Sequence, residues 1–95
     1  MKVKELTCWL SSQYPPSVAE DWDNVGLLVG DDTKEVNHVF LALDLTEDTL
    51  SQAVEAGADM IITHHPMIFG SIRKVNNHSF TGRRILSLIR HDIQY

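Results

Sequence analysis

With 95 residues, of which 43% are hydrophobic, the chain has the size of one small domain and is too apolar for a disordered segment. Its formal charge of −5 argues against general nucleic-acid binding. A single cysteine, Cys8, excludes an internal disulfide and favours a cytoplasmic location, and Glu5 and Gln13 interrupt the N-terminal apolar stretch, which argues against a signal peptide or a membrane span. We expect residues 1–95 to form a single domain.

Residues 2–14 are predicted to form an amphipathic helix. The apolar residues there recur at helical spacing, at Val3, Leu6 and Leu10. Pro15-Pro16 then stops the pattern. Trp9 lies beside this stripe, and we expect both Trp9 and Cys8 to belong to the core.

The next segment is predicted to hold a turn and two strands. Residues 17–20 have capping-box spacing and precede the polar run 21–24, after which Gly26 marks a bend. Residues 27–29 are expected to form a short strand, and residues 36–43 have the composition of a longer, buried strand.

A helix is predicted between this strand and another one. Thr46 is a suitable N-cap, two acidic residues follow in the first turn, and Gly57 is placed to end the helix near Ala56. The strand at residues 60–63 follows at once, so the β-α-β unit should have parallel strands and a right-handed crossover. The inner face of the helix should contain Leu50, Ala53 and Val54.

The C-terminal part repeats this pattern. A polar loop at residues 69–77 precedes a second helical stripe that ends at Arg90-His91, and residues 93–95 resemble a third strand. The stripe consists of Ile85, Leu88 and Ile89. The predicted fold is therefore α/β, with β-α-β units, a mostly parallel sheet and flanking helices.

Two adjacent histidines, His64 and His65, follow the apolar strand at residues 60–63 and suggest a metal site. Adjacent side chains on a regular strand point to opposite faces, so the pair converges only if the strand has ended, as Pro66 suggests. Parallel strands also bring Asp44 to the same sheet edge. The alternative is that one histidine packs on the core and the other is a solvated loop residue.

The remaining candidate ligands have structural explanations. Asp44 is equally suited to ligate a metal or to hold its loop by hydrogen bonds. His38 is expected to pack within a strand, His78 lies in a polar loop, and His91 lies at a helix C-terminus, where a cation is favoured. No Cys-x-x-Cys, Walker or Ser-His-Asp pattern supports another chemistry, and no catalytic residue is assigned.

Basic residues are concentrated in the last part of the chain. Residues 71–95 contain five basic residues against one acidic, whereas residues 1–70 contain three against twelve. A basic segment after a metal site could receive phosphate, and solvated surface charge is an equal alternative. Arg73 and Lys74 are the candidates for phosphate contact.

Several blocks together resemble the Nif-three-like family, whose members are also called dinuclear metal-centre proteins or GTP cyclohydrolase type 2 homologues. The resemblance runs through nearly all 95 residues. It is carried by the blocks Ala19-Glu20-Asp21-Trp22-Asp23-Asn24-Val25-Gly26-Leu27-Leu28-Val29-Gly30, Leu43-Asp44-Leu45-Thr46, Ala58-Asp59, His64-His65-Pro66 and Phe69. Asp23 and Asn24 match the family motif, but turn formation explains them, so they are not assigned to the site.

The resemblance implies a cytosolic α/β protein that assembles into a toroidal homohexamer, with two divalent metal ions per subunit, whether zinc, iron or manganese. His64 and His65 match its histidine ligands, and the family's other ligands lie beyond the strand at Ile93. This chain therefore resembles the N-terminal part of a larger Nif-three-like domain. The resemblance further implies hydrolysis of a nucleotide or phosphate substrate by metal-activated water; the alternative is a non-catalytic, metal-stabilised interaction or regulatory protein.

Overall fold

The computed structural model describes residues 1–13, 25–68 and 70–95. The predicted turn at residues 17–20, the polar run 21–24 and Phe69 lie outside these ranges. In chain order the described residues form α1 (Val3–Gln13), β1 (Val39–Ala42), α2 (Glu47–Glu55), β2 (Met60–Thr63) and α3 (Phe80–Arg90). None of these helices is long and apolar enough to cross a membrane.

The sheet confirms the predicted parallel β-α-β unit. β1 pairs with β2 in parallel, with Val39 opposite Met60. On the other side of β2, Ile61 donates its N–H to the carbonyl of Gln94 at 2.8 Å, and Met60 and Gln94 form a parallel bridge. The expected third strand is thus present as a single bridge. The predicted strand at residues 27–29 is not regular, although the Leu28 and Val29 N–H groups donate to the carbonyl of Tyr95 at 2.7 and 3.0 Å.

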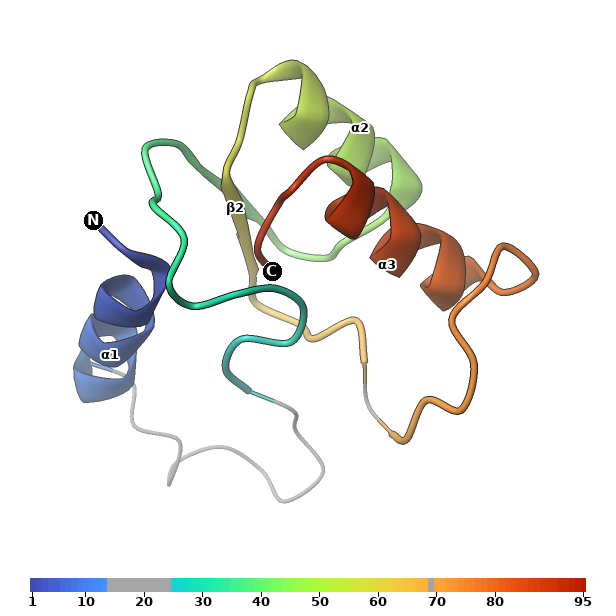
Figure 1. Cartoon of the computed structure of the whole chain (residues 1–95), viewed down its shortest axis with the longest axis horizontal. Helices are drawn as coiled ribbons and strands as arrows, with labels where there is room; N and C mark the ends of the chain where they lie inside the picture. Colours follow the sequence, from blue (N-terminus) through green and yellow to red (C-terminus); the bar gives the residue numbers. More distant parts are fainter. Residues whose placement is uncertain (14–24, 69) are drawn as a thin grey trace.

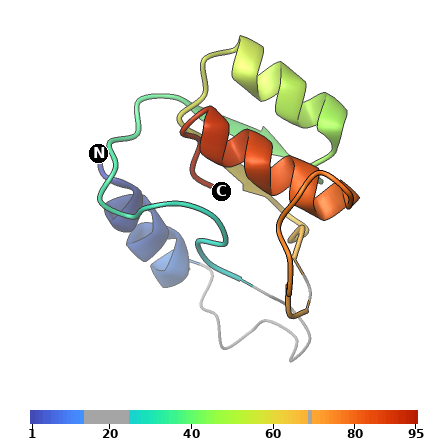
Figure 2. The ribbon, with the colours of Figure 1, turned by 45° about the vertical axis from the view of Figure 1, so that its right-hand side comes forward.

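Two helices, α2 and α3, lie side by side over one face of the sheet, which we call the covered face (Figures 1 and 2). As predicted, Thr46 caps α2: its side chain accepts the Thr49 N–H, and the Thr49 hydroxyl accepts the Thr46 N–H, which completes a capping box. Gly57, at φ +72°, follows the helix end. The core on this face consists of Leu45, Leu50, Ala53, Ile61, Met67, Ile85, Leu88, Ile93 and Tyr95.

The opposite face of the sheet, which we call the open face, is covered only in part by α1. Val3, Val36 and Met60 form a small separate cluster there. Adjacent strand residues point to opposite faces, so Met60 packs on the open face while its neighbour packs on the covered face. The open side of β1 is exposed, and Leu41 in particular is 72% exposed. The prediction of a buried strand at residues 36–43 is therefore wrong: the regular strand is shorter, and one of its sides is exposed. The exposed apolar strip consists of Val39, Leu41 and Leu43.

Two further burial predictions, those for Trp9 and Cys8, are wrong. Trp9 is 55% exposed and Cys8 is exposed, because α1 buries only its first turn at Val3. Ile89 is 62% exposed, because α3 packs through Gly82, Ile85 and Leu88. Helical spacing identifies the apolar side of a helix, but the width of the buried stripe depends on what packs against it.

A buried amide side chain joins the C-terminal segment to a loop far away in the sequence. Gln94 is 4% exposed; its Oε1 accepts the Asp31 N–H at 2.6 Å, and its Nε2 donates to the carbonyl of Asp92 at 3.2 Å. Gly30, at φ +133°, lies directly against this amide. The Thr33 hydroxyl donates to the Asp31 carboxylate at 2.6 Å and lowers the pKa of Asp31 below its ordinary value.

Candidate metal centre

The two adjacent histidines lie at the carboxyl ends of the strands. β2 ends at Thr63, and the chain bends at His64 and His65. Their N–H groups donate to the carbonyls of Ala42 and Leu43 at 3.3 and 3.1 Å, so the backbone pairing with the β1 segment continues through both residues. Because the regular strand has ended, the two imidazoles lie near each other, with ring centroids 4.8 Å apart and planes at 57°. Both residues are exposed, so neither packs into the core as the alternative interpretation required.

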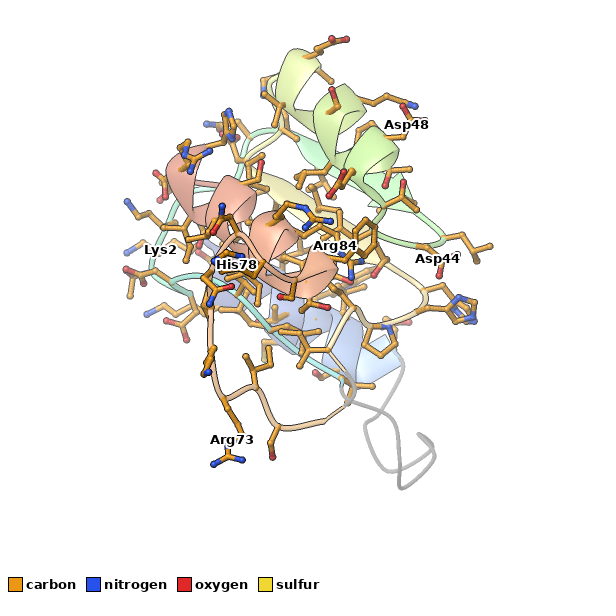
Figure 3. All side chains as sticks on the ribbon, turned by 90° about the vertical axis from the view of Figure 1, so that its right-hand side faces the viewer. Lys2, Asp44, Asp48, Arg73, His78 and Arg84 are labelled. Carbon is orange, nitrogen blue, oxygen red and sulfur yellow. The ribbon has the colours of Figure 1, made fainter. Side chains whose placement is uncertain are left out.

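Asp44 lies on the same edge, as the parallel topology predicted. Its Oδ1 is 2.8 Å from Nδ1 of His65, and both side chains are about half exposed. Its backbone carbonyl accepts a hydrogen bond from the Thr49 hydroxyl at 3.1 Å, which connects this loop to the first turn of α2. Figure 3 labels Asp44 on the loop before α2. The structure thus brings together all three residues that the topology placed at this edge.

Two residues that sequence reasoning did not select support the turn at His65. The Thr63 hydroxyl donates to the His65 carbonyl at 2.7 Å and lies 2.8 Å from the Tyr95 hydroxyl. The Tyr95 hydroxyl also accepts the Met67 N–H at 3.1 Å, and Tyr95 itself is buried. A buried tyrosine needs a hydrogen-bond partner, so a tyrosine in the neighbouring strand is the signal that could have identified this contact.

The other histidines lie elsewhere. His38 precedes β1 and is exposed, with Nδ1 3.9 Å from the Asp59 carboxylate, so the prediction that it packs within a strand is wrong. His78 is exposed in the loop before α3 (Figure 3). His91 caps the C-terminus of α3, and its Nδ1 is 2.8 Å from the Ser87 carbonyl, which agrees with its predicted structural role.

The basic residues of the C-terminal part divide into two groups. Arg83 donates to the Glu47 carboxylate at 3.0 Å, and Arg84 lies over the Phe80 ring at 4.1 Å and donates to the Leu45 carbonyl, so both join α3 to the α2 region. Burial lowers the pKa of Arg84 below its ordinary value. By contrast, Arg73 is exposed and lies well away from Asp44 in Figure 3.

Lys74 is exposed and lines a pocket of about 270 Å³ that also contacts Met67, two residues beyond His65. Of the two basic residues selected for phosphate contact, Lys74 therefore borders this pocket.

The donor set at the strand ends suits a metal but does not complete a site. Neither imidazole nitrogen of His64 forms a hydrogen bond within the described part of the chain, and Nε2 of His65 is likewise without one. Imidazole nitrogens of this kind are common ligands of zinc and iron. Across residues 1–13, 25–68 and 70–95, however, no group of three or more His, Cys, Asp or Glu side chains is arranged to hold a metal ion. The two histidines therefore fit as part of a ligand set.

Comparison with known proteins supports the sequence resemblance. The family model described as Duf34/NIF3 (NGG1p interacting factor 3) matches residues 1–95. A Clostridium perfringens protein named GTP cyclohydrolase 1 type 2 homolog is 40% identical over 93 residues, which are 98% of this chain and 36% of the relative. A Staphylococcus aureus protein of the same name is 44% identical over 93 residues, which are 98% of this chain and 25% of the relative.

Solved structures show the same fold. A crystal structure of a Staphylococcus aureus hypothetical protein, 44% identical, superposes with a TM-score of 0.93 over 99% of this chain and 31% of its own. A Bacillus cereus protein described as related to NIF3, 35% identical, gives a TM-score of 0.90 over 99% of this chain and 26% of its own. The chain thus spans about a quarter to a third of the relatives that it matches.

Proposed function

Since the chain belongs to the Duf34/NIF3 (NGG1p interacting factor 3) family, we propose that it is part of a divalent-metal-binding protein in which His64 and His65 are two of the ligands. The observation that supports this most directly is the pair of exposed imidazoles at one strand end, with ring centroids 4.8 Å apart. Backbone pairing with the β1 segment holds both residues, while both ring nitrogens of His64 and Nε2 of His65 have no hydrogen-bond partner among the described residues.

The complete site in this proposal contains two divalent ions, of zinc, iron or manganese, and further ligands from outside these 95 residues. A catalytic zinc site normally uses three protein ligands and one water, so two histidines are too few. The chain spans only 36% of the Clostridium perfringens relative, which leaves ample sequence for the rest of the ligands.

For the reaction we propose hydrolysis of a nucleotide or phosphate substrate. The name of the relatives, GTP cyclohydrolase 1 type 2 homolog, is the reason to include GTP among the substrates tested. When bound, a divalent metal supplies Lewis-acid activation of water. In this chain His64 and His65 would hold the ion at the sheet edge, and Lys74, beside its pocket, would contact a phosphate group. The cytoplasm is the proposed location, because a single cysteine suits a reducing compartment.

Zinc titration of a full-length family member that contains this segment, as wild type and as the double variant His64→Ala/His65→Ala, tests the metal proposal. Loss of two imidazole ligands should weaken zinc binding by at least about tenfold in calorimetry. The matched control is His38→Ala/His78→Ala, which removes two exposed histidines that do not lie at the carboxyl ends of the strands. Equal affinity in wild type and His64→Ala/His65→Ala, or no zinc binding by wild type, would contradict the proposal.

A second candidate function is a non-catalytic, metal-stabilised interaction or regulatory protein, with a homohexamer as the proposed assembly. The exposed apolar strip of β1 favours this candidate, because Leu41 is 72% exposed and Leu43, which also belongs to the strip, directly precedes Asp44. The two candidates differ in what chelation should do to a full-length family member that contains this segment. If chelation stops nucleotide hydrolysis, the protein is an enzyme; if it dissociates the oligomer of a protein with no turnover on a nucleotide panel, the second candidate holds.

A further inference from the structure

We propose that Asp44 is a positioning residue that fixes the tautomer and orientation of His65, so that Nε2 of His65 is presented to the metal. This inference rests on the proposed metal function. It starts from one contact, the 2.8 Å separation between Asp44 Oδ1 and His65 Nδ1.

The chemistry of that contact determines where the imidazole proton lies. An ionised carboxylate only accepts hydrogen bonds, so the ring nitrogen that faces it must carry the hydrogen. With the proton on Nδ1, a neutral His65 ring has its lone pair on Nε2. A metal-binding histidine commonly donates its other ring N–H to a carboxylate in this way, which fixes the ring and raises the basicity of the ligand nitrogen.

The backbone makes this arrangement rigid. The His65 N–H donates to the carbonyl of Leu43 at 3.1 Å, and Leu43 directly precedes Asp44. One short segment therefore holds His65 at two points, its amide and its ring. The Asp44 carbonyl in turn accepts the Thr49 hydroxyl at 3.1 Å, which ties the segment to the capping box of α2.

The two histidines differ in this respect. His65 has a carboxylate partner, whereas the His64 ring has no hydrogen bond to any described residue. We therefore assign Asp44 to His65 as an outer-shell partner. The sequence left two roles open for Asp44, direct ligation and hydrogen bonding, and here Asp44 takes the second.

The first test needs no metal. Long-range nitrogen–proton NMR spectra of the metal-free protein report which ring nitrogen of each histidine carries the proton. In wild type at pH 8, His65 should carry it on Nδ1, whereas Asp44→Ala should shift His65 toward the Nε2-protonated form that exposed histidines favour. Asp44→Asn should largely preserve the wild-type form, because its amide oxygen still accepts a hydrogen bond. His78, exposed and distant from Asp44, is the internal reference (Figure 3).

The second test measures zinc affinity in a full-length family member that contains this segment. Asp44→Ala should weaken binding by about 10- to 100-fold, as removal of an outer-shell partner typically does, and Asp44→Asn should weaken it less. Asp48→Asn is the matched control, because it removes an exposed carboxylate of α2 that pairs with Gln52. Thermal unfolding of each variant identifies a fold that has failed.

The possible outcomes distinguish a failure of the role proposed for Asp44 from a failure of the proposed metal function. An unchanged His65 tautomer in a folded Asp44→Ala overturns the inference, whatever the metal does. Unchanged zinc affinity in Asp44→Ala, together with lost affinity in His64→Ala/His65→Ala, overturns the inference and leaves the proposed function standing. Absence of zinc binding by the full-length wild type, with the His65 proton on Nδ1, overturns the proposed function instead and leaves Asp44 only as a hydrogen-bond partner of the turn.

Discussion

The two faces of the sheet differ in how completely they are covered. Among the residues that the structure describes, α2 and α3 bury a cluster of nine residues on the covered face, whereas α1 shares a cluster of three on the open face. The contacts that hold the candidate metal centre belong to the covered side: Tyr95 is part of its core, and Asp44 is tied to the cap of α2. The geometry around His65 therefore depends on the α2/α3 half of the molecule.

The largest expected difference comes from truncating one buried side chain on each face. Leu88 is fully buried in the larger cluster, so Leu88→Ala should lower the free energy of unfolding by about 2–5 kcal/mol. Val3 is also fully buried, but in the smaller cluster. Val3→Ala should lower the free energy of unfolding by about 1.5 kcal/mol, because only two carbons are removed. Urea denaturation monitored by circular dichroism measures both.

Because Leu88→Ala removes three carbons and Val3→Ala removes two, the two losses are compared per carbon removed. A loss per carbon at Val3 equal to or larger than that at Leu88 would break the comparison, since it would show that α1 is anchored as firmly as α3.

Helix caps provide a smaller effect. Thr46→Ala removes the side-chain oxygen that accepts the Thr49 N–H at 3.0 Å, and should cost about 1 kcal/mol of stability. Thr7→Ala on α1 is the matched change, because the Thr7 hydroxyl only donates to the Lys4 carbonyl within the helix; it should change stability by less than about 0.5 kcal/mol. Thermal unfolding compares the two. A Thr7→Ala variant as destabilised as Thr46→Ala would contradict the role given to the cap.

The smallest effect on stability is expected at the exposed apolar strip. Leu41→Lys should change the unfolding free energy by less than about 0.5 kcal/mol, because Leu41 is already 72% exposed. It should nevertheless reduce binding of a hydrophobic dye and lower self-association in sedimentation experiments, since a charge interrupts an apolar patch beside an edge strand. Lys4→Arg, an exposed change that keeps its charge, should alter neither. A large loss of stability in Leu41→Lys would mean that the strip is packed in solution.

Local signals predicted much of the fold and of the candidate site. The N-cap at Thr46, the helix end at Gly57 and the parallel pairing of β1 with β2 are confirmed, and that pairing is sufficient to place Asp44 beside His65. These features depend on short-range chemistry and on one topological rule. Metal binding by the two histidines stays a prediction.

The features that were missed depend on long-range packing. The exposure of Trp9 and Leu41 follows from the incomplete cover of the open face, and no local pattern encodes which segment lies on which face. The Tyr95 hydroxyl reaches Thr63 across 32 positions of the sequence, so this support of the turn emerges only when the strands are assembled.

The contact between Gly30 and Gln94 limits which residues these two positions can accept. A Cβ atom at position 30 would collide with the amide of Gln94, and the backbone there, at φ +133°, is one that other residues rarely adopt. Replacing Gln94 by a smaller residue would make space, but it would leave the Asp31 N–H without its acceptor. Positions 30 and 94 are therefore expected to vary as a pair, so that two segments more than sixty residues apart in the sequence change together.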